Sequence, residues 1–450
     1  MLMHEPSCVE VNLSAIDHNM AVIRRLVGDG CRLCPIIKAD AYGLGAARIA
    51  RRLAASGADL LAVYSLPQAA ELGRAAGGLT AGAAGSENTV PVPVWVLMPV
   101  TEIRQGDECS RMLLSGRLQL TVHDLSHLDA LAALADQYAT PIPVHVEVDT
   151  GMSRGGACPH DAARVLERIA GDERFVLKGV FTHFTNARSD RDGTDMQLAQ
   201  FDNVLTRCAS CIPADAFIHV ASTYALFRHA RYHRTMVRFG LAWAGYGLEE
   251  LEAGELDIGD DALRPVLRWR SRIVQVKRIP VGAAVGYGSR WTAKRPSTIG
   301  LIPVGYADGF PVFRPVDESG PAQRIAVLRE VQRGARTEFV REFVPVIGTV
   351  NMDQITVDLT DVDLLNQPLG GLGMTVEIVS PDAGAPNHLP RLASRAGMIP
   401  HEMLCRVHPR IPRFYLVDGV VDGAIDAPVA ESEAPPAQDA RGSNSRSAAG

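Results

Sequence analysis

Short apolar runs alternate with longer amphipathic segments through the first half of the chain. Such runs predict buried strands at 33–38, 60–64, 93–97, 118–122, 142–148, 175–181, 217–220 and 236–239. Apolar residues at helical spacing predict helices at 14–26, 45–55, 67–75, 125–137, 160–170 and 196–208. Strands alternating with helices form parallel sheets, and eight of them within about 210 residues predict an α/β fold that begins with a (β/α)8 TIM-type barrel.

The pattern changes after residue 247. Segment 249–261 holds seven acidic residues and no basic one, which indicates a solvated connection. Apolar runs separated by Gly, Pro and Asp then predict strands at 266–276, 298–304, 343–347, 354–358 and 375–379. The stretch 75–90, rich in Gly and Ala, and the stretch 315–342, with several Arg and Glu, predict loops.

We therefore predict four regions. Residues 1–12 contain a strand that joins the C-terminal domain, 13–248 form the barrel, 249–425 form a mainly β domain, and 426–450 form a disordered tail. The tail has no aromatic residue and is dominated by Ala, Pro, Ser, Gly and charged residues, so it cannot bury enough apolar surface to fold.

Composition limits the possible partners and locations. The 450 residues carry a net charge of −6, so the chain has no general cationic field to hold nucleic acid. The sequence contains no run of about 18 apolar residues that could span a membrane. The N-terminus lacks the basic start and apolar stretch of a secretion signal. A cytoplasmic location is expected. Eight cysteines include two C-x-x-C pairs, at 31–34 and 208–211, for which we expect buried free thiols, with a four-thiolate zinc site as the alternative.

The sharpest chemical signal is the segment 35–45, PIIKADAYGLG. Lys38 ends the first predicted strand, so it lies at the end of the barrel where barrel enzymes place their chemistry. A desolvated amine there has a lowered pKa and can form a Schiff base with an aldehyde. The alternative is an ordinary surface lysine at a strand end.

This segment resembles the cofactor-lysine motif of the alanine racemases, enzymes of fold type III that depend on pyridoxal 5′-phosphate (PLP). The resemblance runs from 9–13 (VEVNL) to 410–413 (RIPR), nearly the whole chain. It implies that Lys38 carries PLP and that Tyr42 hydrogen-bonds the phosphate. Thr223, Gly240 and Leu241 are also implied as phosphate ligands.

The segment 148–154, VDTGMSR, resembles the family's segment after the fifth strand. Arg154 is thereby expected to contact the phenolic oxygen of PLP and the substrate carboxylate, a planar group that suits a guanidinium. The family often has a carbamylated lysine where this chain has Glu147. We hypothesise that Glu147 pairs with Arg154 directly.

Four further roles follow from the resemblance. Arg238, in 237–241 (VRFGL), faces the pyridine nitrogen, and His183 is the partner of a catalytic tyrosine. That tyrosine is Tyr287, in 285–289 (VGYGS), which enters the active site of the other subunit. Tyr306 and Met352 line the substrate carboxylate site across the same homodimer interface.

The resemblance implies PLP-dependent racemisation of alanine by two bases, with Lys38 serving the D-enantiomer and Tyr287 the L-enantiomer, and a supply of D-alanine for peptidoglycan. A racemase of the same fold acting on serine or a broader set of amino acids is the nearest alternative, because Pro409 stands where many relatives have a tyrosine at the substrate entrance. A PLP-dependent decarboxylase would carry a multi-glycine phosphate loop that is not found here. A non-catalytic PLP carrier resembles the barrel alone.

Overall fold

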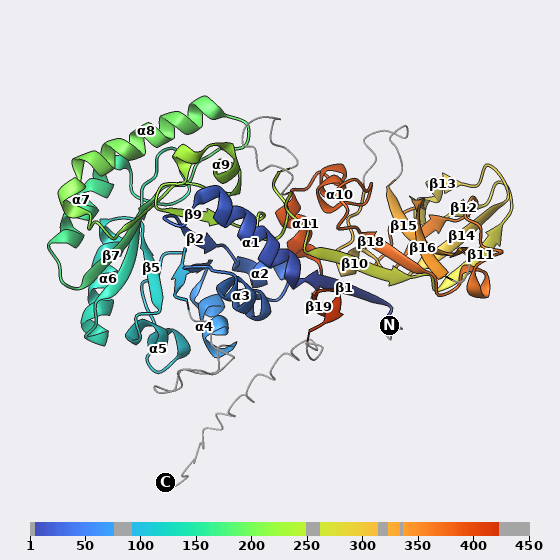
Figure 1. The fold of residues 1–450 in the computed structure, drawn as a ribbon, viewed down its shortest axis with the longest axis horizontal. Coiled ribbons are helices and arrows are strands. Elements are labelled where there is room, and N and C mark those ends of the chain that lie inside the picture. Colours follow the sequence, from blue (N-terminus) through green and yellow to red (C-terminus); the bar gives the residue numbers. More distant parts are fainter. Residues whose placement is uncertain (1–4, 76–91, 249–261, 314–322, 334–335, 423–450) are drawn as a thin grey trace, which may run out of the picture.

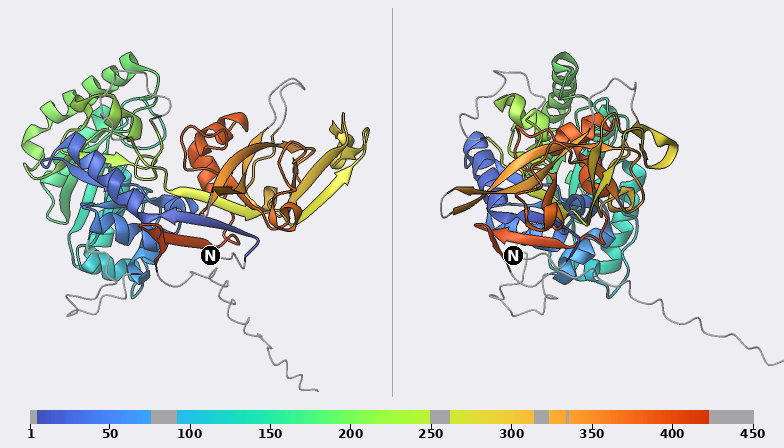
Figure 2. Two further views of the ribbon diagram at one scale, coloured as in Figure 1. Left: turned by 45° about the vertical axis from the view of Figure 1, so that its right-hand side comes forward. Right: turned by 90° about the vertical axis from the view of Figure 1, so that its right-hand side faces the viewer.

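The computed structural model describes residues 5–75, 92–248, 262–313, 323–333 and 336–422. The predicted acidic connection at 249–261, the predicted tail at 426–450 and almost all of the predicted loop at 75–90 lie outside these residues. Figures 1 and 2 show two lobes, a barrel ringed by helices and a curved sheet with two short helices beside the barrel.

The N-terminal lobe is the predicted (β/α)8 barrel. Strands β3 to β8 form one parallel sheet in sequence order, and β2 pairs with β9 in parallel. A parallel bridge from Ile36 to Ala62 joins β2 to β3, and the amide of Thr235 donates to the carbonyl of Ile218 beside β8 and β9. The strands are β2 (Arg32–Pro35), β3 (Leu61–Val63), β4 (Val94–Val96), β5 (Leu118–Val122), β6 (Ile142–Glu147), β7 (Phe175–Phe181), β8 (Phe217–His219) and β9 (Met236–Phe239).

Amphipathic helices cover the outside of the barrel. Several begin at an aspartate whose carboxylate accepts a hydrogen bond from a free amide of the first turn; Asp124 accepts from His127 and Asp190 from Gly193 in this way. The helices are α1 (Leu13–Val27), α2 (Lys38–Gly43), α3 (Ala46–Ala55), α4 (Leu66–Ala75), α5 (Glu108–Leu114), α6 (Leu125–Tyr138), α7 (Pro159–Ala170), α8 (Arg191–Arg207) and α9 (Thr223–Arg228).

The second lobe is built on a ten-stranded sheet of order β11-β14-β17-β16-β15-β18-β10-β1-β19-β20. Its strands are β1 (Ser7–Asn12), β10 (Leu267–Arg272), β11 (Gln275–Ile279), β14 (Ser297–Ile302), β15 (Arg324–Arg333), β16 (Arg336–Ile347), β17 (Ile355–Asp358), β18 (Thr375–Val379), β19 (Arg413–Val417) and β20 (Val420–Val421). A small hairpin, β12 (Ala284–Val285) with β13 (Trp291–Thr292), and two helices, α10 (Leu389–Arg395) and α11 (Pro400–Arg406), complete it. Strand β1 pairs antiparallel with β10 and parallel with β19, so the two ends of the folded chain lie side by side.

The loop predicted at 315–342 is wrong over its second part. Strands β15 and β16 form a long antiparallel hairpin in register from Arg324 opposite Pro345 to Arg333 opposite Arg336. The charges that suggested a loop pair across the hairpin, as Arg329 does with Glu342 at 2.5 Å. Apolar residues near the start of β15 are buried, so the charged half is the solvent-facing part of a strand.

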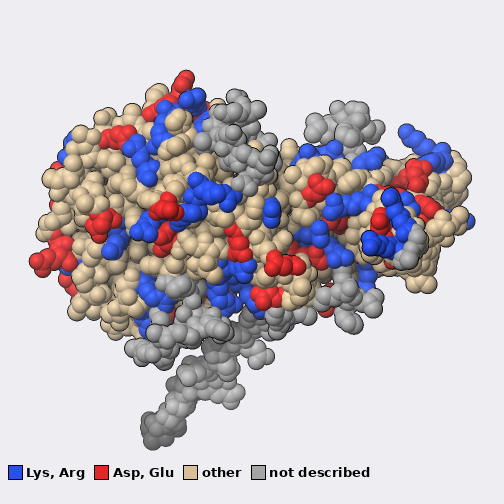
Figure 3. Space-filling view, in the orientation of Figure 1, with Lys and Arg blue, Asp and Glu red and all other residues tan. Residues whose placement is uncertain are grey.

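Charges of both signs are interspersed on the molecular face shown in Figure 3, over the barrel and the second lobe alike. In the described part of the chain, no helix combines the length and apolar character needed to cross a membrane.

Candidate active site

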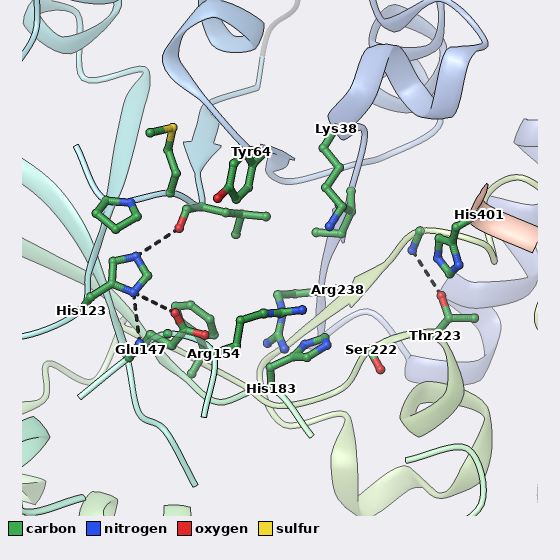
Figure 4. A pocket seen from close by; sticks show the side chains of 18 of the residues that line it. Lys38, Tyr64, His123, Glu147, Arg154, His183, Ser222, Thr223, Arg238 and His401 are labelled. Atoms are coloured by element: carbon green, nitrogen blue, oxygen red, sulfur yellow. Dashed lines mark hydrogen bonds and ion pairs between the residues drawn. The ribbon is translucent and has the colours of Figure 1, made fainter. Parts of the chain in front are cut away.

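A cavity of about 610 Å³ opens at the C-terminal ends of the barrel strands (Figure 4). Its walls come from nearly every strand end of the barrel and from one residue of α11. Of the residues implied by the resemblance, those that line it are Lys38, Tyr42, Glu147, Arg154, His183, Thr223, Arg238 and Gly240. Leu241 follows directly behind this wall and is buried.

Lys38 begins a turn with an unusual backbone. The next four residues, 39–42, all have left-handed dihedral angles, with φ between 51° and 59°. For residues with a side chain this conformation costs roughly 1–2 kcal/mol each, so the turn stores about 4–8 kcal/mol. Both Lys38 and Tyr42, at the two ends of this turn, line the cavity.

Contacts from distant parts of the chain hold this turn. The Asp40 carboxylate accepts a 2.6 Å hydrogen bond from the amide of Ala46 and thereby anchors the turn to α3. Arg413 donates to the carbonyl of Gly43 through Nε at 3.1 Å and Nη2 at 3.0 Å. The hydroxyl of Tyr415 donates to the next carbonyl, that of Leu44, at 3.0 Å.

The surroundings of the Lys38 amine lower its pKa. Burial lowers its pKa from the ordinary value, and the neighbouring Arg154 guanidinium lowers it further. Both effects increase the unprotonated fraction, which is the form that attacks an aldehyde or takes a proton.

Arg238, in β9, is 4% exposed, and the barrel uses four of its five N–H donors. Nη1 donates to Nδ1 and to the carbonyl of His219 at 2.9 and 2.8 Å; Nη2 donates to the carbonyls of Thr182 at 2.8 Å and Val220 at 3.3 Å. Within the described residues Nε–H has no partner, and Arg238 lines the cavity. Burial lowers the pKa of Arg238 to about 10, so it remains a cation at neutral pH.

Behind Arg238 runs a buried chain of hydrogen bonds that the sequence analysis missed. His219 Nε2 lies 3.1 Å from His145 Nδ1, and His145 Nε2 lies 2.7 Å from Gln119 Oε1. Burial, followed by Arg238, lowers the pKa of His145 to about 3 and that of His219 well below its usual range, so both rings are neutral. Because Arg238 only donates, His219 accepts at Nδ1 and carries its proton on Nε2, and His145 then donates to Gln119. The sequence held one sign of this chain, because Gln119, His145 and His219 each stand in an otherwise largely apolar strand.

His183 follows β7 and lines the cavity. Burial lowers its pKa to about 3, with further contributions from Arg238 and Arg154, so the ring is neutral. The nearby Arg238 donates to His219 and makes no hydrogen bond to His183 within the described residues. Among the residues described, none hydrogen-bonds His183, which leaves its ring nitrogens for a group from outside the barrel.

Glu147, at the end of β6, does not pair with Arg154 as predicted. Its Oε2 lies 3.0 Å from Nδ1 of His123, a residue that the sequence analysis did not single out. No hydrogen bond or ion pair joins Glu147 to Arg154 in the part of the chain that the structure describes, so the predicted direct pairing is wrong. The backbone after Arg154 instead rests on the new pair: a Cβ at Gly155 would lie 3.2 Å from Glu147 Oε2 and 3.4 Å from His123 Nδ1.

The opposite end of the cavity is rich in hydrogen-bond donors. The ring of Tyr42 stacks on Trp243 with centroids 5.7 Å apart, and its hydroxyl lies over Gly240, where a Cβ would be 2.1 Å from the oxygen. The amide of Gly240 donates to Thr223 Oγ1 at 3.2 Å. The amide of Leu241 has no partner within the described residues. Hydroxyls and amides gathered in this way suit a phosphate group.

Tyr287, Tyr306 and Met352 do not line the cavity of their own chain. They lie in the second lobe and are 78%, 47% and 55% exposed. Their segments are held together, because Tyr306 donates its amide to the carbonyl of Asn351 at 3.0 Å and Thr349 Oγ1 donates to the carbonyl of Tyr287 at 2.8 Å. Large apolar or aromatic side chains grouped on an exposed edge are typical of an interface.

The residues at the barrel mouth fit PLP. A buried amine of lowered pKa suits the aldehyde, the remaining Nε–H of Arg238 suits a ring nitrogen, and the donors around Gly240 suit a phosphate. No group of three or more His, Cys, Asp or Glu within the described residues is placed to hold a metal ion. Fold and site together define a barrel enzyme that uses PLP.

Comparison with known proteins identifies the family. A family model described as the alanine racemase N-terminal domain matches residues 11–248, and one described as the C-terminal domain matches residues 266–415. The alanine racemase of Desulfovibrio desulfuricans is 33% identical over 415 residues, which cover 91% of this chain and 98% of that protein. The chain therefore belongs to the alanine racemase family, which confirms the predicted fold class, isomerase class and PLP cofactor.

Solved structures of alanine racemases have a similar fold. The alanine racemase of Clostridium difficile 630 matches with a TM-score of 0.76 at 25% identity and covers 95% of this chain and 100% of that one. The alanine racemase of Bartonella henselae, with covalently bound pyridoxal phosphate, matches with a TM-score of 0.69 at 24% identity and covers 92% of this chain and 100% of that one.

Proposed function

We propose that this chain interconverts L-alanine and D-alanine with PLP held across the barrel mouth, and that it supplies D-alanine for peptidoglycan. The observation that carries the proposal is Arg238, whose four Nη donors are used by the barrel while its Nε–H is left for the cofactor. This donor supports a placement of the pyridine nitrogen on the β9 side of the cavity. Lys38 would hold the aldehyde carbon, and Tyr42, with the group around Gly240, the phosphate.

When bound, PLP supplies an electron-withdrawing ring that makes the Cα proton of an attached amino acid removable. Arg238 tunes this effect because it can donate a hydrogen bond and cannot accept one. Arg238 would therefore keep a ring nitrogen that faces it without a proton, which would weaken electron withdrawal and disfavour transamination. The buried chain through His219 and His145 keeps the guanidinium in this orientation.

Racemisation needs a proton removed from one face of Cα and another delivered to the opposite face. Lys38 Nζ, whose pKa burial lowers, serves the face that carries the D-enantiomer's proton. On the other face we place Tyr287 of the partner subunit, hydrogen-bonded to His183. Support for this placement comes from the unpartnered, neutral ring of His183 and from the exposure of Tyr287.

The substrate carboxylate would bind Arg154, with Tyr306 and Met352 of the partner subunit closing this side. This arrangement makes a homodimer necessary for activity. Substrate breadth is tested by following D/L interconversion of alanine, serine, lysine and arginine. A serine rate constant kcat/KM above that for alanine would overturn the assignment of alanine.

Two substitutions test the division of labour. Lys38→Ala should remove the absorption band of protein-bound PLP together with exchange of the Cα proton of both enantiomers in D2O. Tyr287→Phe should keep the band and slow exchange of the L-alanine proton at least 100-fold more than that of D-alanine, since general-base catalysis contributes about 10²–10⁴-fold. Equal losses for both enantiomers would contradict the assignment. Tyr138→Phe, remote from the cavity, is the matched control.

Mixing the two inactive variants tests the shared site. If each site takes Lys38 from one chain and Tyr287 from the other, a mixed dimer contains one intact site and one doubly defective site. After subunit exchange of equal amounts, activity should return to roughly a quarter of the wild-type value. A mixture that stays inactive, although mixed dimers are detected by mass spectrometry, would show that each site lies within one chain.

A further inference from the structure

One wall of the cavity comes from outside the barrel. Of the residues that line it, His401 alone belongs to the second lobe, where it lies in the first turn of α11. Its ring meets Tyr42 edge-on, with centroids 5.5 Å apart and planes at 83°. Figure 4 shows it beside Thr223, at the end of the cavity opposite His123 and Glu147.

Polar atoms around His401 lack partners in the described chain. Neither nitrogen of its ring takes part in a hydrogen bond there, and the same holds for the Tyr42 hydroxyl and the Ser222 hydroxyl, which line the same end. The Tyr42 side chain is buried, with 3% of its surface exposed. These atoms open into the cavity, so they are available to a polar ligand bound there.

The chemistry of this end selects an anion with several acceptor oxygens. Tyr42 and Ser222 contribute two hydroxyls, and the carboxylate of Glu147, which also lines the cavity, belongs to its other end. Tyr42 is fixed between two rings, stacked on Trp243 and met edge-on by His401. A hydroxyl held in this way is aimed before the ligand arrives.

We infer that His401 is an additional ligand of the cofactor's phosphate group, contributed to the barrel site by the C-terminal domain. The inference rests on the cofactor placement proposed above. Pro409, a few residues beyond α11, has no side-chain donor and does not line the cavity, whereas His401 does.

The state of the ring agrees with this role. Burial, followed by the charge of Lys38, lowers the pKa of His401 to about 4, so the ring is neutral at pH 7 and carries one N–H donor. A hydrogen bond from a neutral donor to a charged acceptor contributes more than one between neutral groups. The edge contact with Tyr42 keeps that donor directed at the same ligand.

Two variants separate hydrogen bonding from packing. His401→Phe keeps a ring against Tyr42 and removes the donor, whereas His401→Gln keeps a donor and removes the ring. Each full-length protein is freed of cofactor and titrated with PLP and, separately, with pyridoxal, which lacks the phosphate. The bound cofactor band gives the two dissociation constants, and 31P NMR of the holoenzyme reports the phosphate environment directly.

We expect His401→Phe to weaken PLP binding roughly 10- to 100-fold, to leave pyridoxal binding within about twofold, and to shift the 31P resonance. His401→Gln should retain most of the affinity for PLP. If His401→Phe weakens PLP and pyridoxal equally, or weakens neither, His401 is not a phosphate ligand. Wild-type protein that binds no PLP overturns the proposed function itself, which is a distinct outcome.

Discussion

Arg413 gives the sharpest test of how the Lys38 turn is held. Its guanidinium donates to the carbonyls of Gly43, Val407, His408 and Ile411, so one side chain joins the turn to the segment before β19. The left-handed residues 39–42 are stable only if such contacts offset their conformational cost. Arg413→Ala removes the donor of these four carbonyl groups, some of which are partly buried.

The expected loss can be worked out from these contacts. At about 1 kcal/mol for each carbonyl left without its donor, Arg413→Ala should lower the free energy of unfolding by about 3–5 kcal/mol. Part of this loss should appear locally, because relaxation of residues 39–42 toward ordinary dihedral angles moves Lys38 and Tyr42 away from the cavity. Arg413→Lys, which restores a single donor group, should fall between Ala and wild type.

The assay is urea unfolding followed by tryptophan fluorescence at fixed protein concentration, combined with titration by PLP. Arg406→Ala is the matched control, because Arg406 lies nearby on α11 and its side chain is more than half exposed. Among the described residues it pairs only with Glu402 on its own helix, so the substitution should change stability by no more than about 0.5 kcal/mol. If Arg413→Ala behaved like Arg406→Ala in both stability and PLP affinity, the turn would not depend on this clamp.

Two further predictions follow. Burial holds the pKa of His145 at about 3, below the value near 6.5 of an unfolded histidine. Between these two pH values the unfolded state binds more protons than the folded state, so the free energy of unfolding falls as the pH falls. The loss from His145 at pH 5 is about 2 kcal/mol. His145→Gln should flatten the fall measured by urea unfolding at pH 5 to 7, whereas His160→Gln, at an exposed position, should not, and equal slopes for all three proteins would contradict it. Gly240→Ala places a Cβ 2.1 Å from the Tyr42 hydroxyl and should weaken PLP binding at least 10-fold without unfolding the protein; unchanged affinity in a titration would contradict the phosphate site.

The barrel could be predicted because its strands are buried on both sides and read as continuous apolar runs. Lys38 and Arg238 were selected by the resemblance of their segments to those of the alanine racemases, and the structure brings both to one cavity. The hairpin β15–β16 was missed because its charges pair only when two strands meet, as Arg329 and Glu342 do. A window along one strand does not contain that information.

The sequence analysis also missed site residues whose roles depend on tertiary contacts. His145 and His219 are meaningful only side by side in the barrel interior, and His123 is meaningful only against Glu147. His401 is the extreme case, because it reaches the cavity from another lobe. A lone histidine in a sequence is most often a packed core residue, so no spacing rule could have selected these four.

The clamp from Arg413 to Gly43 spans 370 residues of sequence, and this has a consequence for synthesis. The barrel leaves the ribosome first, yet the turn that carries Lys38 waits for a strand made almost last. At about 5–20 residues per second, synthesis from the end of the barrel at residue 248 to Arg413 takes roughly 8–33 seconds. During that time the barrel sequence is complete, but the turn that carries Lys38 lacks its contacts with Arg413. We therefore expect a chain that terminates before Arg413 to lack the contacts that hold the Lys38 turn.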